Sequence, residues 1–368
     1  MTGQVNMVSL SLLLLLLVHS AANDSLDILI KRMTERLMKS KAEDLRRRSL
    51  EIPFSSLKKS TARNDSASPL VFLHGMGDSC FNPGMKSITE ESGDYMNVYS
   101  TCIPTGDTWL ADTLNGFLLS MDANVDVFAE KVKGDPMLAN GFNCIGFSQG
   151  NNICRGYIQK YNDPPVTTHL SVHGPVVGVA SLPDCDPSNI HIGDLCIEVD
   201  DVLAEFAYNE KIQSFFFQAN YFRDVSYVNT TDYMEYSQVR TKLTLKKLLK
   251  TPKLTLKTPA HAQIGAWNNE GTEVSITDKE NFGKTQRFAM IKAMGDTVVI
   301  PNEGEWWGAY DTDFETILTM KETVWYRDDL FGLKTADEAG KIFLNSTTGN
   351  HLEFTEDELF GWLDQYCL

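Results

Sequence analysis

The stretch GFNCIGFSQG, residues 141–150, decides the fold. It begins as a continuous apolar run, ends in Gly-Phe-Ser-Gln-Gly, and is followed by NNICRGYIQKY, which has the pattern of a helix. A Gly-X-Ser-X-Gly sequence between a strand and a helix is typical of a strained turn that exposes a serine hydroxyl at the end of a sheet. Glycines on either side let the strand and the helix pass close together. We therefore expect Ser148 to be a nucleophile.

Apolar runs alternate with helical patterns from residue 69 onward. Short apolar runs separated by helices indicate a mostly parallel sheet with helices on both faces, so we predict an α/β fold of the α/β-hydrolase type. A helical and loop insertion over the active site, residues 198–285, is expected to interrupt a domain of residues 69–368. The strand-like runs are PLVFLHG (69–75), NVYSTCIP (97–104), GFNCIGF (141–147), HLSVHG (169–174), RFAMIKAMGD (287–296) and KIFLNSTTGNH (341–351).

A serine hydroxyl needs a histidine to accept its proton and an acid to hold that histidine, and this fold places them in the chain order Ser, Asp or Glu, His. Of the histidines well beyond Ser148, which are His191, His261 and His351, only His351 lies between a late apolar run and a terminal helix. Asp296 directly follows a strand, at the edge of the sheet where ligands bind. A solvent-exposed loop histidine and a turn or helix-capping aspartate are the alternative interpretations.

Acyl transfer also needs backbone N–H groups that stabilise an oxyanion. One is expected from Gln149, directly after the nucleophile. The other is expected from Met76, in the sequence HGMGD (74–78) that follows the first strand. Since His74 precedes the serine, it is predicted to fix this loop by hydrogen bonds rather than to act as a base.

The N-terminus has the pattern of a signal peptide, residues 1–22, with an apolar run from Val8 to Val18 and small residues near Ala22. Residues 23–68 predict an amphipathic helix and a linker, with a propeptide as the alternative. Outside the leader, no stretch is long and apolar enough to predict a transmembrane segment. Four glycosylation sequons fit the secretory route. They begin at Asn23, Asn64, Asn229 and Asn345.

The formal net charge of -16 excludes a general nucleic-acid partner, which would require a basic face. No zinc-ligand spacing of cysteine and histidine is present, so neither a metal nor another cofactor is expected. Cys144 is interpreted as a small buried apolar residue, and a bridge between Cys185 and Cys196 would pin the polar loop between them. The pairing of Cys80, Cys102, Cys144, Cys154 and Cys367 stays open. A basic segment, residues 241–258, contains KLTLK twice and is expected to be a surface loop, or an error in the gene model.

Several stretches together resemble the palmitoyl-protein thioesterase family. They include PLVFLHGMGDSCFNP (69–83), GFNCIGFSQG (141–150), QANYFRD (218–224), GDTVVIPNEGEWWGAY (295–310) and LFGLKTADEAGKIFLNSTTGNHLEF (330–354). The resemblance implies a serine thioesterase of the lysosome, or a secreted one, that cleaves long-chain acyl groups such as palmitate from cysteine in S-acylated proteins or peptides. It also implies the bridge between Cys185 and Cys196. It assigns the nucleophile, acid, base and oxyanion donors to Ser148, Asp296, His351, Met76 and Gln149.

The sequence departs from the family pattern where Asn151 replaces a second glycine after GFSQG, a change expected to crowd the start of the helix. A further departure lies at residues 173–178, HGPVVG. An oxygen-ester lipase or esterase and a catalytically silent lipid-binding protein are therefore alternative functions. Aromatic side chains are candidates either for an acyl groove or for the core. They are Phe215, Phe216, Phe217, Phe222, Trp306 and Trp307.

Overall fold

The computed structural model describes residues 68–181, 207–208, 210–228, 263–271 and 275–367, together with Lys31, Glu35 and Lys39. Several predictions lie outside these residues: the signal peptide, most of residues 23–68, the bridge between Cys185 and Cys196, the basic segment, and the sequons at Asn23, Asn64 and Asn229. The chain divides into two compact units, one made of Met1–Ser56 and Pro187–Val202, the other of Leu57–Asp186 and Leu203–Leu368. In the first unit Lys31, Glu35 and Lys39 are helical and exposed, and Lys31 pairs with Glu35 at 3.9 Å.

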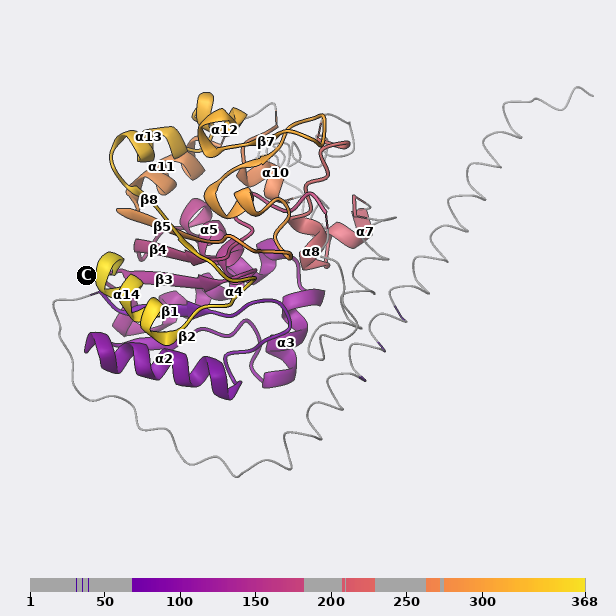
Figure 1. The fold of residues 1–368 in the computed structure, drawn as a ribbon. Helices are drawn as coiled ribbons and strands as arrows, with labels where there is room; N and C mark the ends of the chain where they lie inside the picture. Colours follow the sequence, from indigo (N-terminus) through magenta and orange to yellow (C-terminus); the bar gives the residue numbers. More distant parts are fainter. Residues whose placement is uncertain are drawn as a thin grey trace, which may run out of the picture. The chain divides into compact units, whose positions relative to one another are not determined.

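The second unit is built on a six-stranded sheet in the order β2-β1-β3-β4-β5-β8, in which every neighbouring pair is parallel (Figure 1). Five strands lie within the apolar runs and β4 begins three residues before its run, so the predicted α/β fold is confirmed. The strands are β1 (Leu70–Leu73), β2 (Ser100–Cys102), β3 (Phe142–Phe147), β4 (Val166–Val172), β5 (Arg287–Ala293) and β8 (Ile342–Thr347).

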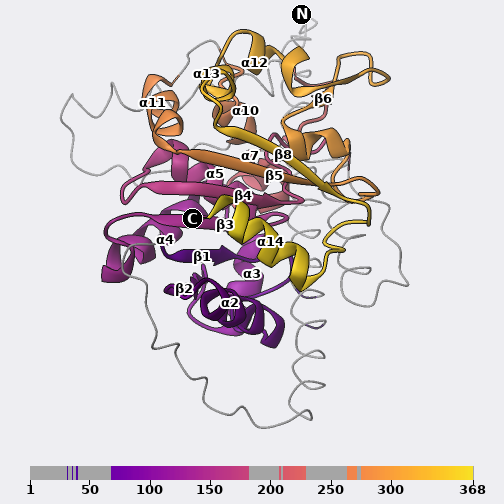
Figure 2. The same ribbon diagram turned by 60° about the vertical axis from the view of Figure 1, so that its left-hand side comes forward.

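Helices cover both faces of the sheet because successive side chains of a strand point to opposite faces. On one face, Phe72 and Ile145 pack in a buried cluster with Leu359 of α14 (Glu356–Tyr366) and Met85 of α2 (Pro83–Met96). Figure 2 shows α14 in front of the sheet. Helix α5 (Gly150–Lys160) packs on β3 and contacts both α4 (Met121–Gly134) and α11 (Ile276–Lys284).

Shorter elements complete the described part of the chain. Of the predicted insertion, the structure describes α7 (Glu210–Gln213), α8 (Phe217–Asn220), α10 (Gln263–Trp267) and α11. None of the helices in the described residues is both long and apolar enough to cross a membrane. The remaining elements are α3 (Trp109–Leu118), η1 (Pro136–Leu138), η2 (Asn302–Trp306), β6 (Ala309–Tyr310), β7 (Ile317–Leu318), η3 (Met320–Glu322), α12 (Val324–Arg327) and α13 (Leu333–Glu338).

Two disulfides join elements of this unit, one at the central strand β3 and one at the edge strand β2. Cys144 on β3 is bonded to Cys154 on α5, and Cys80 is bonded to Cys102 at the end of β2. The side chain of Cys144 is fully buried, as expected, and its pairing, which the sequence left open, is with Cys154. The bridge forms because Cys144, next to Ile145 in the strand, points to the opposite face, where α5 packs. Among the described cysteines, Cys367 is free and buried.

Candidate active site

Ser148 lies directly after β3 in a left-handed backbone conformation, with φ of 50°. Its N–H donates to the carbonyl oxygen of Val172 at 3.0 Å, so the turn is attached to the end of β4. A Cβ atom at Gly150 would lie 2.6 Å from the carbonyl oxygen of Leu73, and therefore only glycine allows α5 to begin so close to β1. A non-glycine residue held in this conformation carries strain of the kind found at functional sites.

The three predicted triad residues meet at the carboxyl edge of the sheet. Nε2 of His351 lies 2.8 Å from Oγ of Ser148, and Nδ1 of His351 lies 2.6 Å from Oδ2 of Asp296. The three residues come from loops after β3, β5 and β8, and the carboxyl ends of parallel strands share one edge. The Asp296 side chain is fully buried, whereas 12% of the His351 side chain is exposed.

Hydrogen bonds determine the charge of Asp296. Burial alone would raise its pKa, but the hydrogen bond from His351 and further donors outweigh burial and hold the pKa below its usual value. Oδ1 accepts from the backbone N–H groups of Val298 at 2.6 Å and Val299 at 2.8 Å. Because an ionised Asp296 can only accept, Nδ1 of His351 must donate to it. Nε2 of His351 is then free to accept the Ser148 proton.

His173 holds the loop that carries His351. Its Nδ1 accepts the backbone N–H of Leu352 at 2.8 Å, and its Nε2 lies 3.1 Å from Oγ1 of Thr347. Burial and the neighbouring His351 lower the pKa of His173 to about 4, so the ring is neutral and Nδ1 can accept. No sequence motif indicated this role, although His173 follows β4 as the other site residues follow their strands.

The predicted oxyanion loop lies against the nucleophile. A Cβ atom at Gly75 would lie 3.3 Å from Cβ of Ser148. The Gly75 carbonyl oxygen lies 2.9 Å from Nδ1 of His74 and accepts the N–H of Asp78 at 3.3 Å. In a trans peptide the following N–H, which is that of Met76, points the opposite way from this carbonyl. Backbone hydrogen bonds in the described residues around the serine use the N–H of Ser148 and of Asn151, and none uses that of Met76 or Gln149.

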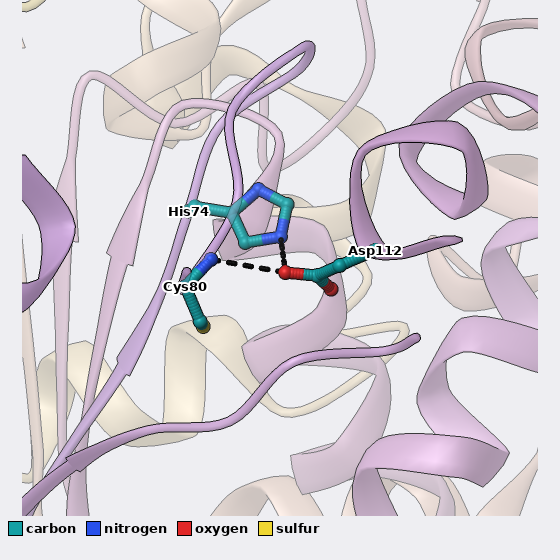
Figure 3. A group of neighbouring side chains, drawn as sticks. All are labelled: His74, Cys80 and Asp112. Carbon is teal, nitrogen blue, oxygen red and sulfur yellow. Dashed lines mark hydrogen bonds and ion pairs between the residues drawn. The ribbon is translucent and has the colours of Figure 1, made fainter. Parts of the chain in front are cut away.

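A buried ion pair between His74 and Asp112 holds this loop in place (Figure 3). Nε2 of His74 lies 3.2 Å from Oδ2 of Asp112, which also accepts from Oγ of Ser79 and the N–H of Cys80. Burial would lower the pKa of His74, but the hydrogen bond to Asp112 and its charge outweigh burial and raise it. His74, Cys80 and Asp112 have ligand atoms close enough to hold a metal ion. However, the Cys80 sulfur is bonded to Cys102 and cannot serve as a thiolate ligand.

The Gln149 side chain connects the nucleophile turn to two helices. Its Nε2 donates to the carbonyl of Gly116 in α3 at 2.9 Å. Its Oε1 accepts from Nε2 of Gln218 at 2.7 Å and from the hydroxyl of Tyr221 at 3.2 Å. These bonds fix the residue whose backbone N–H is the predicted oxyanion donor. The contributions of Gln218 and Tyr221 depend on where α8 packs and had no signal in the sequence.

Asn151 does not crowd the start of α5. It is fully buried, and its Nδ2 donates to the carbonyls of Ser148 at 3.1 Å and Val172 at 3.2 Å. A Cβ atom at Gly174 would lie 2.6 Å from Cβ of Asn151, so the glycine at 174 leaves room for the asparagine at 151.

Three of the predicted groove aromatics, Phe216, Phe217 and Trp307, are fully buried and pack in the core. The Trp306 indole N–H donates to the carbonyls of Met290 and Asn345, each at 3.0 Å.

Asn345 is the one predicted glycosylation site within the described residues. It is partly buried on β8, and its Nδ2 lies 3.4 Å from the Tyr366 hydroxyl.

Comparisons with known proteins agree on one family. The model of the family described as palmitoyl protein thioesterase matches residues 69–243 and 258–351. Palmitoyl-protein thioesterase 1 of Caenorhabditis elegans is 32% identical over 296 residues, covering 79% of this chain and 88% of the relative. Palmitoyl-protein thioesterase 3 of Dictyostelium discoideum is 30% identical over 302 residues, covering 81% and 88%.

More distant proteins were also found. Lysosomal thioesterase PPT2-B of Xenopus laevis is 24% identical over 210 residues, covering 57% of this chain and 62% of the relative. Among solved structures, a lipase of Bacillus licheniformis, BlEst2, has a TM-score of 0.40 at 10% identity, covering 84% of this chain and 95% of its own. The RedJ thioesterase of Streptomyces coelicolor has a TM-score of 0.36 at 11% identity, covering 87% and 94%.

Proposed function

Since the chain belongs to the palmitoyl protein thioesterase family, we propose that Ser148, His351 and Asp296 hydrolyse the thioester between a long acyl chain, such as palmitate, and a cysteine of an S-acylated protein or peptide. The chain is a thioesterase of the α/β-hydrolase superfamily. The observation that carries the assignment of residues is the continuous hydrogen-bond chain from Oγ of Ser148 through His351 to Asp296.

The first half of the reaction forms an acyl-enzyme. Oγ of Ser148 attacks the thioester carbonyl carbon while Nε2 of His351 accepts the hydroxyl proton. The imidazolium that results is stabilised by the ionised Asp296. The N–H groups of Met76 and Gln149 donate to the oxyanion, the carbon–sulfur bond breaks, and the cysteine leaves with the proton from His351. Because a thiol has a pKa near 8.5, it is a good leaving group.

The second half releases the acid. His351 accepts a proton from water, the hydroxide formed attacks the acyl carbon, and the oxyanion again lies at Met76 and Gln149. Collapse of this intermediate breaks the ester to Ser148, and His351 returns the proton to Oγ. The products are a free fatty acid and a free cysteine thiol, and the enzyme is restored.

Active-site labelling tests the assignment directly. A fluorophosphonate probe should form a covalent adduct on Ser148 of the wild-type protein, located by peptide mass spectrometry, and none on the Ser148→Ala variant. The same variant should lose at least about 10³-fold in turnover of a palmitoyl thioester. Labelling of another residue, or a Ser148→Ala variant that turns over at the native rate, would refute the assignment.

Matched substrates distinguish the two alternatives. A palmitoyl thioester and the corresponding oxygen ester, compared on one preparation, should give the higher kcat/KM for the thioester. Preference for the oxygen ester would support an esterase. Binding of the acyl chain without turnover or labelling would support a silent lipid-binding protein.

We further propose that the protein acts in the lysosome and is glycosylated at Asn64, Asn229 and Asn345 after removal of residues 1–22. Two disulfides support an oxidising compartment, and the Xenopus laevis relative is named a lysosomal thioesterase. Glycosidase treatment of the protein from a eukaryotic host should lower its mass, and each Asn→Gln change should remove one glycan. An unchanged mass would exclude glycosylation at these sites.

A further inference from the structure

A second carboxyl group lies buried behind the triad. Glu305 is on η2, and its side chain is fully buried. Its Oε2 accepts the backbone N–H of Ala293, at the end of β5, at 3.0 Å. Its Oε1 is buried too, and no N–H or O–H donor of the described residues reaches it. The carboxyl groups of Glu305 and Asp296 lie at the range of a side-chain hydrogen bond, and each shifts the pKa of the other.

Two carboxyl groups can share a hydrogen bond only when one of them carries a proton. The donors around each group show which one does. Asp296 accepts from Val298, Val299 and His351, and such donors stabilise a carboxylate. Glu305 accepts from a single backbone N–H and is shielded from water. A proton is therefore far better placed on Glu305 than on Asp296.

We propose that Glu305 is a positioning residue that stays protonated in the working enzyme and donates a hydrogen bond to the Asp296 carboxylate. This role rests on the proposed function, in which Asp296 orients His351. It adds a donor behind the catalytic acid without adding negative charge to the site. Neither the Gly-X-Ser-X-Gly motif nor the chain order of the triad indicates such a residue.

The charged groups around Glu305 agree with a neutral carboxyl. Burial, and next the charge of Asp296, raise the pKa of Glu305 to about 10. The cation that acts on Glu305 is Lys292 on β5, but its Nζ pairs with Glu303 at 2.6 Å and lies 4.9 Å from the centre of the Trp306 ring. Since the charge of Lys292 is largely compensated by Glu303, it does not ionise Glu305.

A protonated Glu305 should keep Asp296 ionised when the solution becomes acidic. A donor that stabilises the carboxylate lowers the pKa of Asp296, so the His351–Asp296 pair keeps its working protonation state to lower pH. Loss of the donor should therefore move the acid limb of the kcat/KM profile to higher pH. A residue with only a packing role would change stability without moving this limb.

Three variants test the proposal. Glu305→Gln keeps both interactions, because its amide oxygen can accept from Ala293 and its NH2 group can donate to Asp296, so its pH profile should match the wild type. Glu305→Leu has a similar size but lacks the donor, and kcat/KM should fall by about tenfold to a hundredfold, with the acid limb at higher pH. Asn302→Ala is the control on η2, since it changes no charge: it loses the donations to the carbonyls of Ala293 and Met294 and should be less stable, with its acid limb unmoved.

Infrared spectroscopy reads the proton itself and needs no activity. The difference spectrum of wild type minus Glu305→Gln at neutral pH should contain the carbonyl band of a protonated carboxylic acid. Absence of this band, equal losses in Glu305→Gln and Glu305→Leu, or an unmoved acid limb in a folded Glu305→Leu would overturn the proposal. If Glu305→Leu does not fold, the infrared band and the pH profile of Glu305→Gln still test whether Glu305 is protonated and donates to Asp296. Failure of fluorophosphonate labelling at Ser148 would instead refute the proposed function and leave the band as a separate result.

Discussion

Oδ1 of Asn151 lies 3.1 Å from Nε2 of His169, and both side chains are fully buried beneath the nucleophile turn. Burial, with the positive charge of Arg155 nearby, lowers the pKa of His169 to about 3, so the ring is neutral and its Nε2–H donates to the asparagine. The resemblance to the family leads one to expect a glycine at residue 151. This chain instead ties the first turn of α5 to β4 by a polar contact.

Replacing Asn151 by glycine should therefore cost stability more than chemistry. The change leaves the Nε2–H of His169 buried without an acceptor and removes two donations to backbone carbonyls, at about 1–3 kcal/mol for each buried group left unpaired. We expect urea unfolding of Asn151→Gly to show a loss of that order or larger, while kcat at a temperature where the variant is folded stays within about tenfold of the wild type. A drop in kcat with unchanged stability would contradict this.

The neighbouring Asn152 provides a matched control in the same helical turn. It is also fully buried, yet neither its Oδ1 nor its Nδ2 has a partner among the described residues. Asn152→Ala should therefore be neutral or slightly stabilising, because removing an unpaired buried amide offsets the small cavity. The double variant Asn151→Gly, His169→Leu should recover part of the stability lost by Asn151→Gly alone, since it removes the unpaired ring nitrogen as well.

The sequence could predict that the three proposed triad residues meet, because chain order and strand ends are enough to place them. Ser148, Asp296 and His351 each follow an apolar run, and parallel strands deliver their carboxyl ends to one edge. The positions of the other site residues depend on how helices and strands pack, which the sequence pattern does not specify. The bridge from Cys144 to Cys154 requires knowing which face of β3 packs on α5. Glu305 becomes a neighbour of Asp296 only because η2 folds back against the end of β5.

Stability should depend on pH through the pair of His74 and Asp112. The folded-state pKa of His74 is raised above its ordinary value of 6.5, so the pair contributes fully below pH 6.5, and this contribution is lost as the pH rises through the raised value. Replacing Asp112 by Asn removes the partner. Because breaking a buried ion pair costs about 3–5 kcal/mol, urea unfolding should show a difference of this size between wild type and Asp112→Asn at pH 5.5.

That difference should narrow as the pH rises through the raised pKa of His74, because the ring then loses its proton in the wild type. Part of the difference does not depend on pH and will remain, since Asp112 also accepts the backbone N–H of Thr105 at 2.7 Å and of Gly106 at 3.3 Å. A difference that never narrows as the pH is raised would mean that the ring does not change its charge, and would contradict the prediction.

His173 should produce the opposite dependence. Its folded-state pKa is lowered to about 4. Below pH 6.5 the unfolded chain therefore binds a proton at His173 that the folded protein does not bind, and the stability of the folded state falls as the pH falls toward 4. The contribution lost between pH 7 and pH 5 is about 2 kcal/mol. Asparagine suits the φ of 50° at this position and can accept the Leu352 N–H. Urea unfolding should therefore show a smaller decline for His173→Asn than for the wild type, and equal declines would refute the assignment.

The last prediction concerns how His74 acts on catalysis. If the contact between its Nδ1 and the Gly75 carbonyl sets the direction of the Met76 N–H, replacing His74 by a residue without a hydrogen-bond donor should weaken the stabilisation of the oxyanion by Met76. His74→Leu should then reduce kcat by about 10²–10³-fold, the loss typical of one oxyanion donor, with little change in KM. His74→Asn places its NH2 group near the position of Nδ1 but cannot reach Asp112, so it should be as unstable as His74→Leu while keeping more of kcat. Equal kcat in the two variants, measured where both are folded, would show that His74 contributes only to stability.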